Sequence, residues 1–342
     1  MTSTTIPKTM KAHIYASASP TLEANLSIST SVPTPTLSGP NDLLVQVLSA
    51  SINPADHKLP ALPGLIRRFA VKLPATPGMD FSGRVVQTGA KVDSVAVGDL
   101  VYGRLEPQQH GTLGEYIVAP LKAVALLPKE GVTVDEAAAL GVAGLTAYQT
   151  IHPNVKQGDK IFINGSSGGV GTFAVQIAKV LGCHVTASCS PAKADLVKSL
   201  GADEIIDYTT TNVSEALKGK GKVFAMVLDN VGMPEDLYKA SDDFVIPGGK
   251  FVQVGSPMSL DAVRVAATRV LLPSFLGGGR NKYEVFTINH GPDDLKLLGE
   301  WVKEKKIRVV IEETYEFEDA PKAFAKLRTG KNAGKLVIHV GK

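Results

Sequence analysis

Short apolar runs separated by Gly, Pro and Asp fill the first part of the chain. The runs are followed by turn residues at intervals typical of strands in a small barrel or sandwich. The expected strands lie at residues 43–52, 81–89, 99–105, 114–120 and 123–128. Proline is dense between residues 54 and 77, which predicts a long, partly irregular loop there. The first 125 residues are therefore expected to be β-rich.

The pattern changes near residue 133. Thr133, with Glu136 three residues later, matches a helix-capping box before an Ala-rich helix at 133–151. Strand-like and helix-like segments then alternate, which predicts a parallel sheet with right-handed crossovers. The strands are expected at 159–165, 184–190, 202–208, 224–232 and 250–255, and the first two helices between them at 170–182 and 191–201. Two further helices (292–306 and 319–330) and a last strand (334–340) close the chain.

Composition excludes several classes of protein. The 342 residues are 44% hydrophobic and 20% charged, with a net charge of +3 and no basic block, so nucleic acid is not an expected partner. No apolar run approaches the roughly 18 residues of a membrane span, and the N-terminus lacks a signal core, so a cytoplasmic location is expected. Cys183, Cys189 and the dispersed histidines fit neither a disulfide framework nor a zinc site.

The glycine-rich stretch NGSSGGVG, at residues 164–171, carries the clearest chemistry. It lies between a predicted strand and a predicted helix, at the first turn of the alternating series, where a dinucleotide fold binds pyrophosphate. In the G-x-G-x-x-G register the three positions are Ser166, Gly168 and Gly171, so serine replaces the first glycine. The loop predicted to contact phosphate comprises Ser166, Ser167, Gly168, Gly169, Val170 and Gly171. A tight turn without a ligand is the alternative.

The end of the next strand bears on the choice of cofactor. An NAD site places Asp or Glu about 20 residues after the glycines, on the ribose 2′-hydroxyl. Here the strand is followed by Ser190 and Lys193, and the first carboxylate is Asp195, inside the next helix. A hydroxyl and a lysine suit a 2′-phosphate, so NADPH is the expected cofactor, although Lys193 could also be an ordinary solvated side chain.

Several stretches together resemble the medium-chain dehydrogenase/reductase superfamily, and most of all its zinc-free branch of quinone and enone oxidoreductases. They are SASINPADHK (49–58), PATPGMDFSG and its continuation (74–103), EAAALGVAGLTAYQTI (136–151), NGSSGGVGTFAVQIAK (164–179), LVKSLGADEIIDY (196–208) and AGKLVIHV (333–340). The resemblance implies an α/β fold with two domains and an active site in a cleft between them. A β-rich GroES-like catalytic domain is expected at 1–128 and a Rossmann NADP-binding domain at 129–270, with 271–342 returning to the catalytic domain.

The resemblance also bears on metal chemistry. Zinc-dependent relatives place a cysteine ligand and a Gly-His-Glu motif in the regions where this chain has Asn53 and Asp80. No metal is therefore expected, and without a Lewis acid alcohol oxidation loses its main source of oxyanion stabilisation. Zinc-free relatives reduce quinones or the C=C bond of α,β-unsaturated carbonyls. The predicted function is an NADPH-dependent, zinc-independent oxidoreductase acting on an enone, enal or quinone.

Hydride addition to an enone β-carbon leaves negative charge on the carbonyl oxygen, and a donor aimed at that oxygen would stabilise it. Lys58 is the candidate donor, with Asn53 supporting nicotinamide or substrate and Asp56 orienting Lys58. The alternatives are a turn signal at Asn53, a capping role for Asp56 and a merely solvated Lys58. By resemblance, further cofactor contacts are expected at Asn53, Thr146, Tyr208, Asp229, Asn230, Gly255 and Lys335.

The substrate and the oligomeric state, monomer or homodimer, stay open. Arg67 and Arg68 could attract an acidic substrate, although exposed arginines are often only solvated. The competing hypothesis is a family member that keeps the fold and cofactor binding but has a non-redox, binding or structural role, such as a specialised biosynthetic-pathway protein. The intact glycine loop and the NPADHK segment favour a working reductase.

Overall fold

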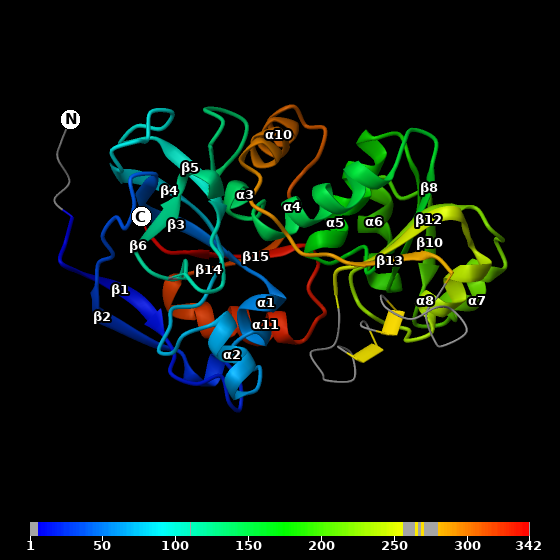
Figure 1. The fold of residues 1–342 in the computed structure, drawn as a ribbon, viewed down its shortest axis with the longest axis horizontal. Helices are drawn as coiled ribbons and strands as arrows, with labels where there is room; N and C mark the ends of the chain where they lie inside the picture. Colours follow the sequence, from blue (N-terminus) through cyan, green and yellow to red (C-terminus); the bar gives the residue numbers. More distant parts are fainter. Residues whose placement is uncertain (1–5, 110, 256–263, 266–267, 270–279, 342) are drawn as a thin grey trace. The chain divides into compact units, whose positions relative to one another are not determined.

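The computed structural model describes residues 6–109, 111–255, 264–265, 268–269 and 280–341. The chain divides into two compact units. Unit 1 comprises Met1–Leu145 with Asn289–Lys342, and unit 2 comprises Thr146–Ile288. Figure 1 shows the course of the chain through both units.

Unit 1 is built on a mixed sheet in the strand order β14-β15-β3-β4-β5-β7, with β6 paired to the other part of the long β3. Strands β1 and β2 form a separate antiparallel pair. The strands are β1 Thr9–Ile14, β2 Ser27–Pro33, β3 Asp42–Ile52, β4 Asp80–Thr88, β5 Leu100–Arg104, β6 Tyr116–Pro120, β7 Val124–Leu126, β14 Ile311–Tyr315 and β15 Lys335–His339. The C-terminal β15 pairs with β3, so the end of the chain completes the sheet that its beginning forms.

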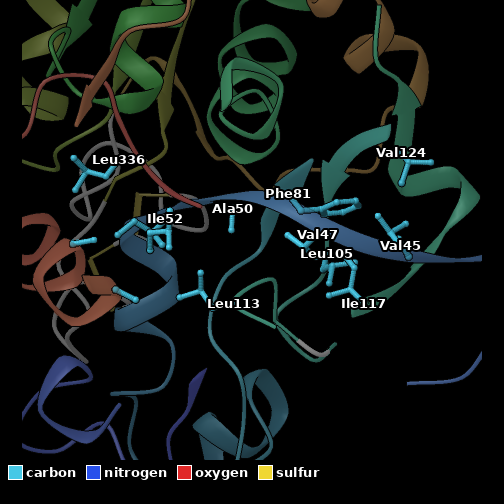
Figure 2. Packing of buried hydrophobic residues seen from close by; sticks show 14 of the residues in the cluster. Val45, Val47, Ala50, Ile52, Phe81, Leu105, Leu113, Ile117, Val124 and Leu336 are labelled. Carbon is cyan, nitrogen blue, oxygen red and sulfur yellow. The ribbon is translucent and has the colours of Figure 1, made fainter. Parts of the chain in front are cut away.

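The core of unit 1 lies against one face of this sheet. Every second residue of β3 from Leu43 to Val47 points into it, as the period-two pattern of a strand requires, and after a register shift Ala50 and Ile52 do so. Figure 2 shows Val45, Val47 and Ile52 of β3 packed with Phe81 of β4 and Leu336 of β15. The helices of this unit are α1 Pro54–Lys58, α2 Gly64–Ala70, α3 Val134–Ala138, α10 Pro292–Lys303 and α11 Ala320–Arg328. Helix α11 contributes buried side chains to the same core.

Unit 2 contains a six-stranded parallel sheet in the order β10-β9-β8-β11-β12-β13. The strands are β8 Lys160–Asn164, β9 His184–Cys189, β10 Glu204–Asp207, β11 Phe224–Asp229, β12 Val245–Gln253 and β13 Lys282–Val285. The helices are α5 Gly169–Val180, α6 Ala194–Ser199, α7 Val213–Lys218 and α8 Leu237–Ala240, and α4 Val142–Ile151 contains the boundary between the units. The order reverses between β8 and β11, so the carboxyl ends of β8, β9 and β11 meet at the point where open α/β sheets bind ligands.

The expected α/β fold is confirmed, with its β-rich and parallel-sheet parts. One local prediction was wrong: residues 54–77 are not simply an irregular loop but contain α1 and α2. Proline density misled there because Pro54 occupies the first turn of α1, where a missing N–H costs nothing. The helix predicted at 133–151 is interrupted between α3 and α4, beside Gly141. Of the described residues, no helix has the length and apolar character to cross a membrane.

Candidate active site and cofactor site

The end of β3 runs directly into the short helix α1, which carries the candidate catalytic residues. Asn53 has extended backbone torsion angles and is the N-cap of α1. The Asp56 carboxylate accepts a hydrogen bond of 2.6 Å from the Asn53 backbone N–H. This contact is half of a capping box, and it fixes the entry into α1 by local sequence alone. The capping role for Asp56, the alternative to its orienting Lys58, is therefore present in the structure.

The Asn53 side chain is held by two residues from distant parts of unit 1. Its Nδ2 donates to Asp80 Oδ2 at 2.8 Å, and its Oδ1 accepts from Lys335 Nζ at 2.5 Å. Lys335 Nζ also lies 3.2 Å from Asp80 Oδ2, so the three side chains close a ring. Asp80 is fully buried, and Asn53 and Lys335 are 4% and 3% exposed. A buried ion pair with complete hydrogen bonding fixes the carboxamide of Asn53 in one orientation.

The remaining hydrogen bonds of this cluster are also made within unit 1. Asp80 Oδ1 accepts from the Val142 backbone N–H at 2.7 Å. The third donor of Lys335 goes to the Ile52 carbonyl oxygen at 3.2 Å. All three protons of the Lys335 ammonium therefore have acceptors in the protein. Lys335 as a cofactor contact stays a prediction, and these bonds support a positioning role as well.

Asp56 is close to this cluster, and the charges of Asp80 and Lys335 affect the pKa of its carboxyl. The pKa of the Asp56 carboxyl is raised to about 7, mainly by burial and in smaller part by the negative charge of Asp80. The hydrogen bond from the Asn53 N–H and the positive charge of Lys335 act in the opposite direction. Asp56 therefore exchanges its proton near neutral pH, which is the range in which acid–base groups work in enzymes.

Lys58 ends α1 and differs from the other charged residues of this site. Its side chain is half-buried, and among the described residues it has neither a hydrogen-bond nor an ion-pair partner. Burial without a counter-charge lowers the pKa of the Lys58 ammonium. The positive charge of Lys58 likewise contributes to lowering the pKa of His57, whose main cause is burial. A desolvated ammonium with unused donors can bind an oxygen that develops negative charge.

In unit 2 the glycine loop joins β8 to α5. Gly165 has φ +73°, a conformation that favours glycine, and a Cβ on Gly171 would lie 2.2 Å from the Gly165 carbonyl oxygen. A Cβ at Gly168 would meet nothing nearer than 3.7 Å, so that position is open. The first backbone N–H groups of α5, at Gly169 and beyond, have no acceptor within the helix. Such groups at a helix N-terminus bind phosphate.

The two serines of the loop have different surroundings. Ser166 is fully buried, and both its Oγ and its backbone N–H donate to the Ser188 carbonyl oxygen of β9, at 2.8 and 3.1 Å. The serine in the first glycine position thus ties the loop to the sheet. Ser167 is partly exposed, and its hydroxyl has no hydrogen-bond partner in the described part of the chain. Ser167 is therefore the serine that has a hydroxyl available for a ligand.

A network of hydrogen bonds between polar side chains connects the carboxyl ends of β8, β9 and β11. Asn164 accepts from the Ser188 hydroxyl at 2.6 Å and donates to Asp229 Oδ1 at 2.9 Å. Asp229 Oδ1 also accepts from the backbone N–H groups of Val231 and Gly232, and burial raises the pKa of this carboxyl. Asn164 and Ser188 had not been predicted as site residues. The position of Asn164, directly before Gly165 at the start of the glycine loop, could have indicated that it is a site residue.

Asn230 and Gly255 follow β11 and β12. The Asn230 Nδ2 donates to the Asn164 carbonyl oxygen at 3.1 Å, whereas its buried Oδ1 has no hydrogen-bond partner. Such an acceptor at a ligand-binding edge fits a donor from a bound cofactor. Gly255 packs against the backbone, because a Cβ there would lie 1.9 Å from the Asn230 carbonyl oxygen. Close packing is thus one physical reason for this glycine.

The other predicted cofactor residues lie on unit 2 as follows. Ser190 is partly exposed at the end of β9, and Lys193 follows three residues later, immediately before α6. Tyr208 follows β10 and is 56% exposed. Thr146 is 4% exposed inside α4. The structure therefore gathers the loop, Ser190, Asp229 and Asn230 at one edge of the sheet. No cluster of three His, Cys, Asp or Glu residues within the described ranges is placed to hold a metal ion.

Unit 1 carries the candidate catalytic residues on a sheet that the C-terminal strand completes, and unit 2 has a parallel sheet with a glycine loop. Together these two units define a nicotinamide-dependent oxidoreductase. Comparisons with known proteins give its family. The alcohol dehydrogenase GroES-like domain family matches residues 39–129, and the zinc-binding dehydrogenase family matches residues 200–338. The chain belongs to the medium-chain dehydrogenase/reductase superfamily, in its zinc-free branch. This confirms the resemblance seen in the sequence motifs.

Individual relatives cover nearly the whole chain. A trans-enoyl reductase from Aspergillus terreus is 45% identical over 350 residues, which cover 98% of each protein. A 2-methylene-furan-3-one reductase from Solanum lycopersicum is 34% identical over 99% of this chain and 81% of its own length. The solved structure of the quinone oxidoreductase from Coxiella burnetii has a TM-score of 0.84 and 30% identity, covering 98% of this chain and all of that one.

Proposed function

We propose that this protein is an NADPH-dependent reductase that adds hydride to the C=C bond of an α,β-unsaturated carbonyl compound. The observation that carries the proposal is Lys58, a half-buried ammonium that has no hydrogen-bond or ion-pair partner among the described residues, at the end of the helix that the hydrogen-bonded cluster begins. Relatives named trans-enoyl reductase and 2-methylene-furan-3-one reductase support the same chemistry. Quinone reduction is the second candidate, favoured by the structural similarity to a quinone oxidoreductase.

The reaction divides between the cofactor and the residues of α1. When bound, the reduced nicotinamide supplies the hydride that the β-carbon receives. Lys58 donates a hydrogen bond to the carbonyl oxygen as it becomes an enolate oxygen, and this bond strengthens as negative charge grows. A proton then adds to the α-carbon to complete the saturated product. The lowered pKa of Lys58 and the near-neutral pKa of Asp56 allow either group to take part in moving that proton.

Asn53 and its partners position this chemistry. Because Asp80 and Lys335 fix both ends of the Asn53 carboxamide, the turn into α1 has one conformation, and Lys58 starts from a defined backbone position. Preorganisation of this kind is what gives a charged donor its catalytic value. Asn53 retains one amide proton and can still support nicotinamide or substrate.

The cofactor assignment rests on unit 2. The N-terminal amides of α5 and the Ser167 hydroxyl bind the pyrophosphate, and Asn230 Oδ1 accepts a hydrogen bond from the nicotinamide half. Ser190 and Lys193 contact the 2′-phosphate. The end of β9 has no carboxylate that would repel this phosphate. The remaining residues expected to contact the cofactor are Tyr208, Thr146, Asp229 and Gly255.

Binding of NADPH and NADH, measured by quenching of Trp301 fluorescence or by calorimetry, tests the cofactor choice. Lys193→Ala is expected to weaken NADPH binding about 10-fold and to leave NADH binding within about 2-fold, because a charge-assisted phosphate contact is worth about 1.4 kcal/mol. Lys198→Ala, an exposed lysine in helix α6, which directly follows Lys193, is the matched control and should change neither. Equal affinity for both cofactors in the wild type, unchanged by Lys193→Ala, would refute the assignment.

The catalytic assignment has its own test. Lys58→Met should lower kcat for an enone about 100-fold, in the range lost with one oxyanion donor, while the dissociation constant of NADPH stays nearly constant. Lys58→Arg should recover part of kcat because the charge is kept. His57→Gln, one residue away, is the control and should retain most of the activity. A Lys58→Met variant with wild-type kcat would remove Lys58 from the mechanism.

A further inference from the structure

The segment between Asp56 and Asp80 carries positive charges and no negative ones. Residues 57–79 contain Lys58, Arg67, Arg68 and Lys72 but no Asp or Glu. In the described ranges Arg67, Arg68 and Lys72 have no ion-pair partner. Elsewhere in unit 1 exposed cations are commonly paired, as Lys326 is with Glu313 and Arg328 with Glu23. Unpaired positive charge concentrated on one segment attracts anions.

Helix α2, at the centre of this segment, also presents large apolar side chains to solvent. Phe69 is 78% exposed and Ile66 is 51% exposed, one turn apart on the same face. The C-terminal end of the helix is anchored, because Ala70 and the following Leu73 pack against the unit 1 core. Gln108 Nε2 also donates to the Phe69 carbonyl oxygen at 3.1 Å. An anchored helix that exposes an aromatic ring directly after two arginines is typical of a binding surface.

This surface is close along the chain to the candidate catalytic lysine. The connection from Lys58 to Gly64 is compact: the Lys58 carbonyl oxygen accepts from the Ala61 N–H, and the Leu59 carbonyl oxygen accepts from the Leu62 N–H, both at 3.2 Å. Six residues span at most about 20 Å when fully extended, and these turns shorten that distance. A single elongated ligand can therefore reach from Lys58 to α2.

We infer that α2 binds an anionic group, a carboxylate or a phosphate, carried by the substrate at the end remote from its C=C bond. Arg67 and Arg68 supply guanidinium groups that match either anion bidentately, and Lys72 adds charge. Phe69 and Ile66 cover the apolar part that joins the anion to the reacting carbons. The inference rests on the proposed function, since it places the C=C bond at Lys58. It assigns the substrate to a class: charged, amphipathic unsaturated carbonyl compounds rather than small neutral enones.

Matched substrate pairs test the inference. Benzalacetone is compared with its para-carboxylate, and the neutral N-acetylcysteamine thioester of trans-2-hexenoic acid with trans-2-hexenoyl-coenzyme A. In each pair the two compounds share the reacting C=C bond, while the first pair differs in a carboxylate and the second in a phosphorylated arm. The wild type should have a KM at least about 5-fold lower for the anionic member of one pair. The pair that shows the preference identifies the anion.

The variants separate α2 from general electrostatics. Arg67→Ala/Arg68→Ala should raise KM for the preferred anion about 10-fold and leave the neutral partner within about 2-fold, whereas Arg67→Lys/Arg68→Lys should recover part of the preference. Lys91→Ala/Lys331→Ala removes the same charge from exposed positions elsewhere and should have no effect. Raising the ionic strength from about 0.05 to 0.5 M should abolish the preference in the wild type alone.

Calorimetry with unreactive ligands separates this inference from the proposed function. The saturated analogues 4-phenylbutan-2-one and 4-(3-oxobutyl)benzoate bind without turnover, as does coenzyme A. Tighter binding of either anion by the wild type, lost in Arg67→Ala/Arg68→Ala, supports the inference even where no substrate oxidises NADPH, a result that would refute only the proposed reductase. Anionic and neutral ligands bound equally well, or a preference that survives the double variant, overturn it.

Discussion

Lys335→Met is the perturbation that most directly tests the buried cluster at the start of α1. The variant removes an ammonium that lies 3.2 Å from Asp80 Oδ2 and also contacts the Asn53 side chain and the Ile52 carbonyl oxygen. Both members of the ion pair are at most 3% exposed, so the charge left on Asp80 cannot be hydrated. Breaking such a pair costs about 3–5 kcal/mol. Because Asp80 keeps its bonds from Val142 and Asn53, we expect about 3 kcal/mol.

Urea unfolding followed by the fluorescence of Trp301 measures this cost. Trp301 is the single tryptophan of the chain and lies in α10 of unit 1, so it reports on the unit that contains the cluster. Adding Asp80→Asn to Lys335→Met removes the stranded charge, and the double-mutant cycle should give a coupling energy of about 2 kcal/mol. Lys322→Met, which breaks an exposed pair with Asp319 in the same unit, should cause no measurable change. A Lys335→Met variant within 1 kcal/mol of the wild type would refute the reasoning.

Three further predictions concern single side chains. Ser166→Ala should lower the free energy of unfolding by about 1 kcal/mol through loss of its bond to β9, whereas Ser167→Ala should spare stability and weaken NADPH binding about 5-fold, as denaturation and calorimetry would show. Because the pKa of Asp56 is raised in the native state to about 7, from its ordinary value of 3.8, the native state keeps between these pH values a proton that the unfolded chain has lost. Asp56 should therefore lower stability as pH rises from about 4 to 7, by at most about 4 kcal/mol, and Asp56→Asn should remove that dependence in unfolding measured across this range. Gly255→Ala should cost at least about 2 kcal/mol, because its Cβ would overlap the backbone of the neighbouring strand end, and thermal unfolding would detect it.

The parts of the structure that were predicted correctly are encoded locally. The glycine loop could be placed between β8 and α5 because a strand pattern, a glycine cluster and a helix pattern follow one another within about 20 residues. Most strands of both sheets were found for the same reason, since each has its own apolar run and its own turn residues, but β13, β14 and the pair of β1 and β2 were not predicted. Segment 54–77 shows the limit of that approach. Its prolines indicated a loop, but their effect depends on their exact position relative to the first turn of each helix.

The parts that were missed depend on contacts distant in sequence. Lys335 meets Asn53 and Asp80 across 282 and 255 residues, and no local pattern indicates which buried carboxylate a lysine will pair with. The orientation of the Ser166 hydroxyl similarly depends on its hydrogen bond to the Ser188 carbonyl oxygen, because β9 lies beside the loop. From sequence, both serines of the loop were equivalent candidates for phosphate. The structure distinguishes them because it shows which hydroxyl is already bonded.

The products formed from benzalacetone and NADPH test the central claim most directly. Wild-type protein should consume one NADPH per substrate and form 4-phenylbutan-2-one, the saturated ketone, because Lys58 stabilises charge on the oxygen while the β-carbon receives hydride. Lys58→Met should form the same product about 100-fold more slowly. Formation of the allylic alcohol, in which the C=O bond has been reduced instead, would contradict the account, as would NADPH that binds but is not oxidised by any enone, enal or quinone.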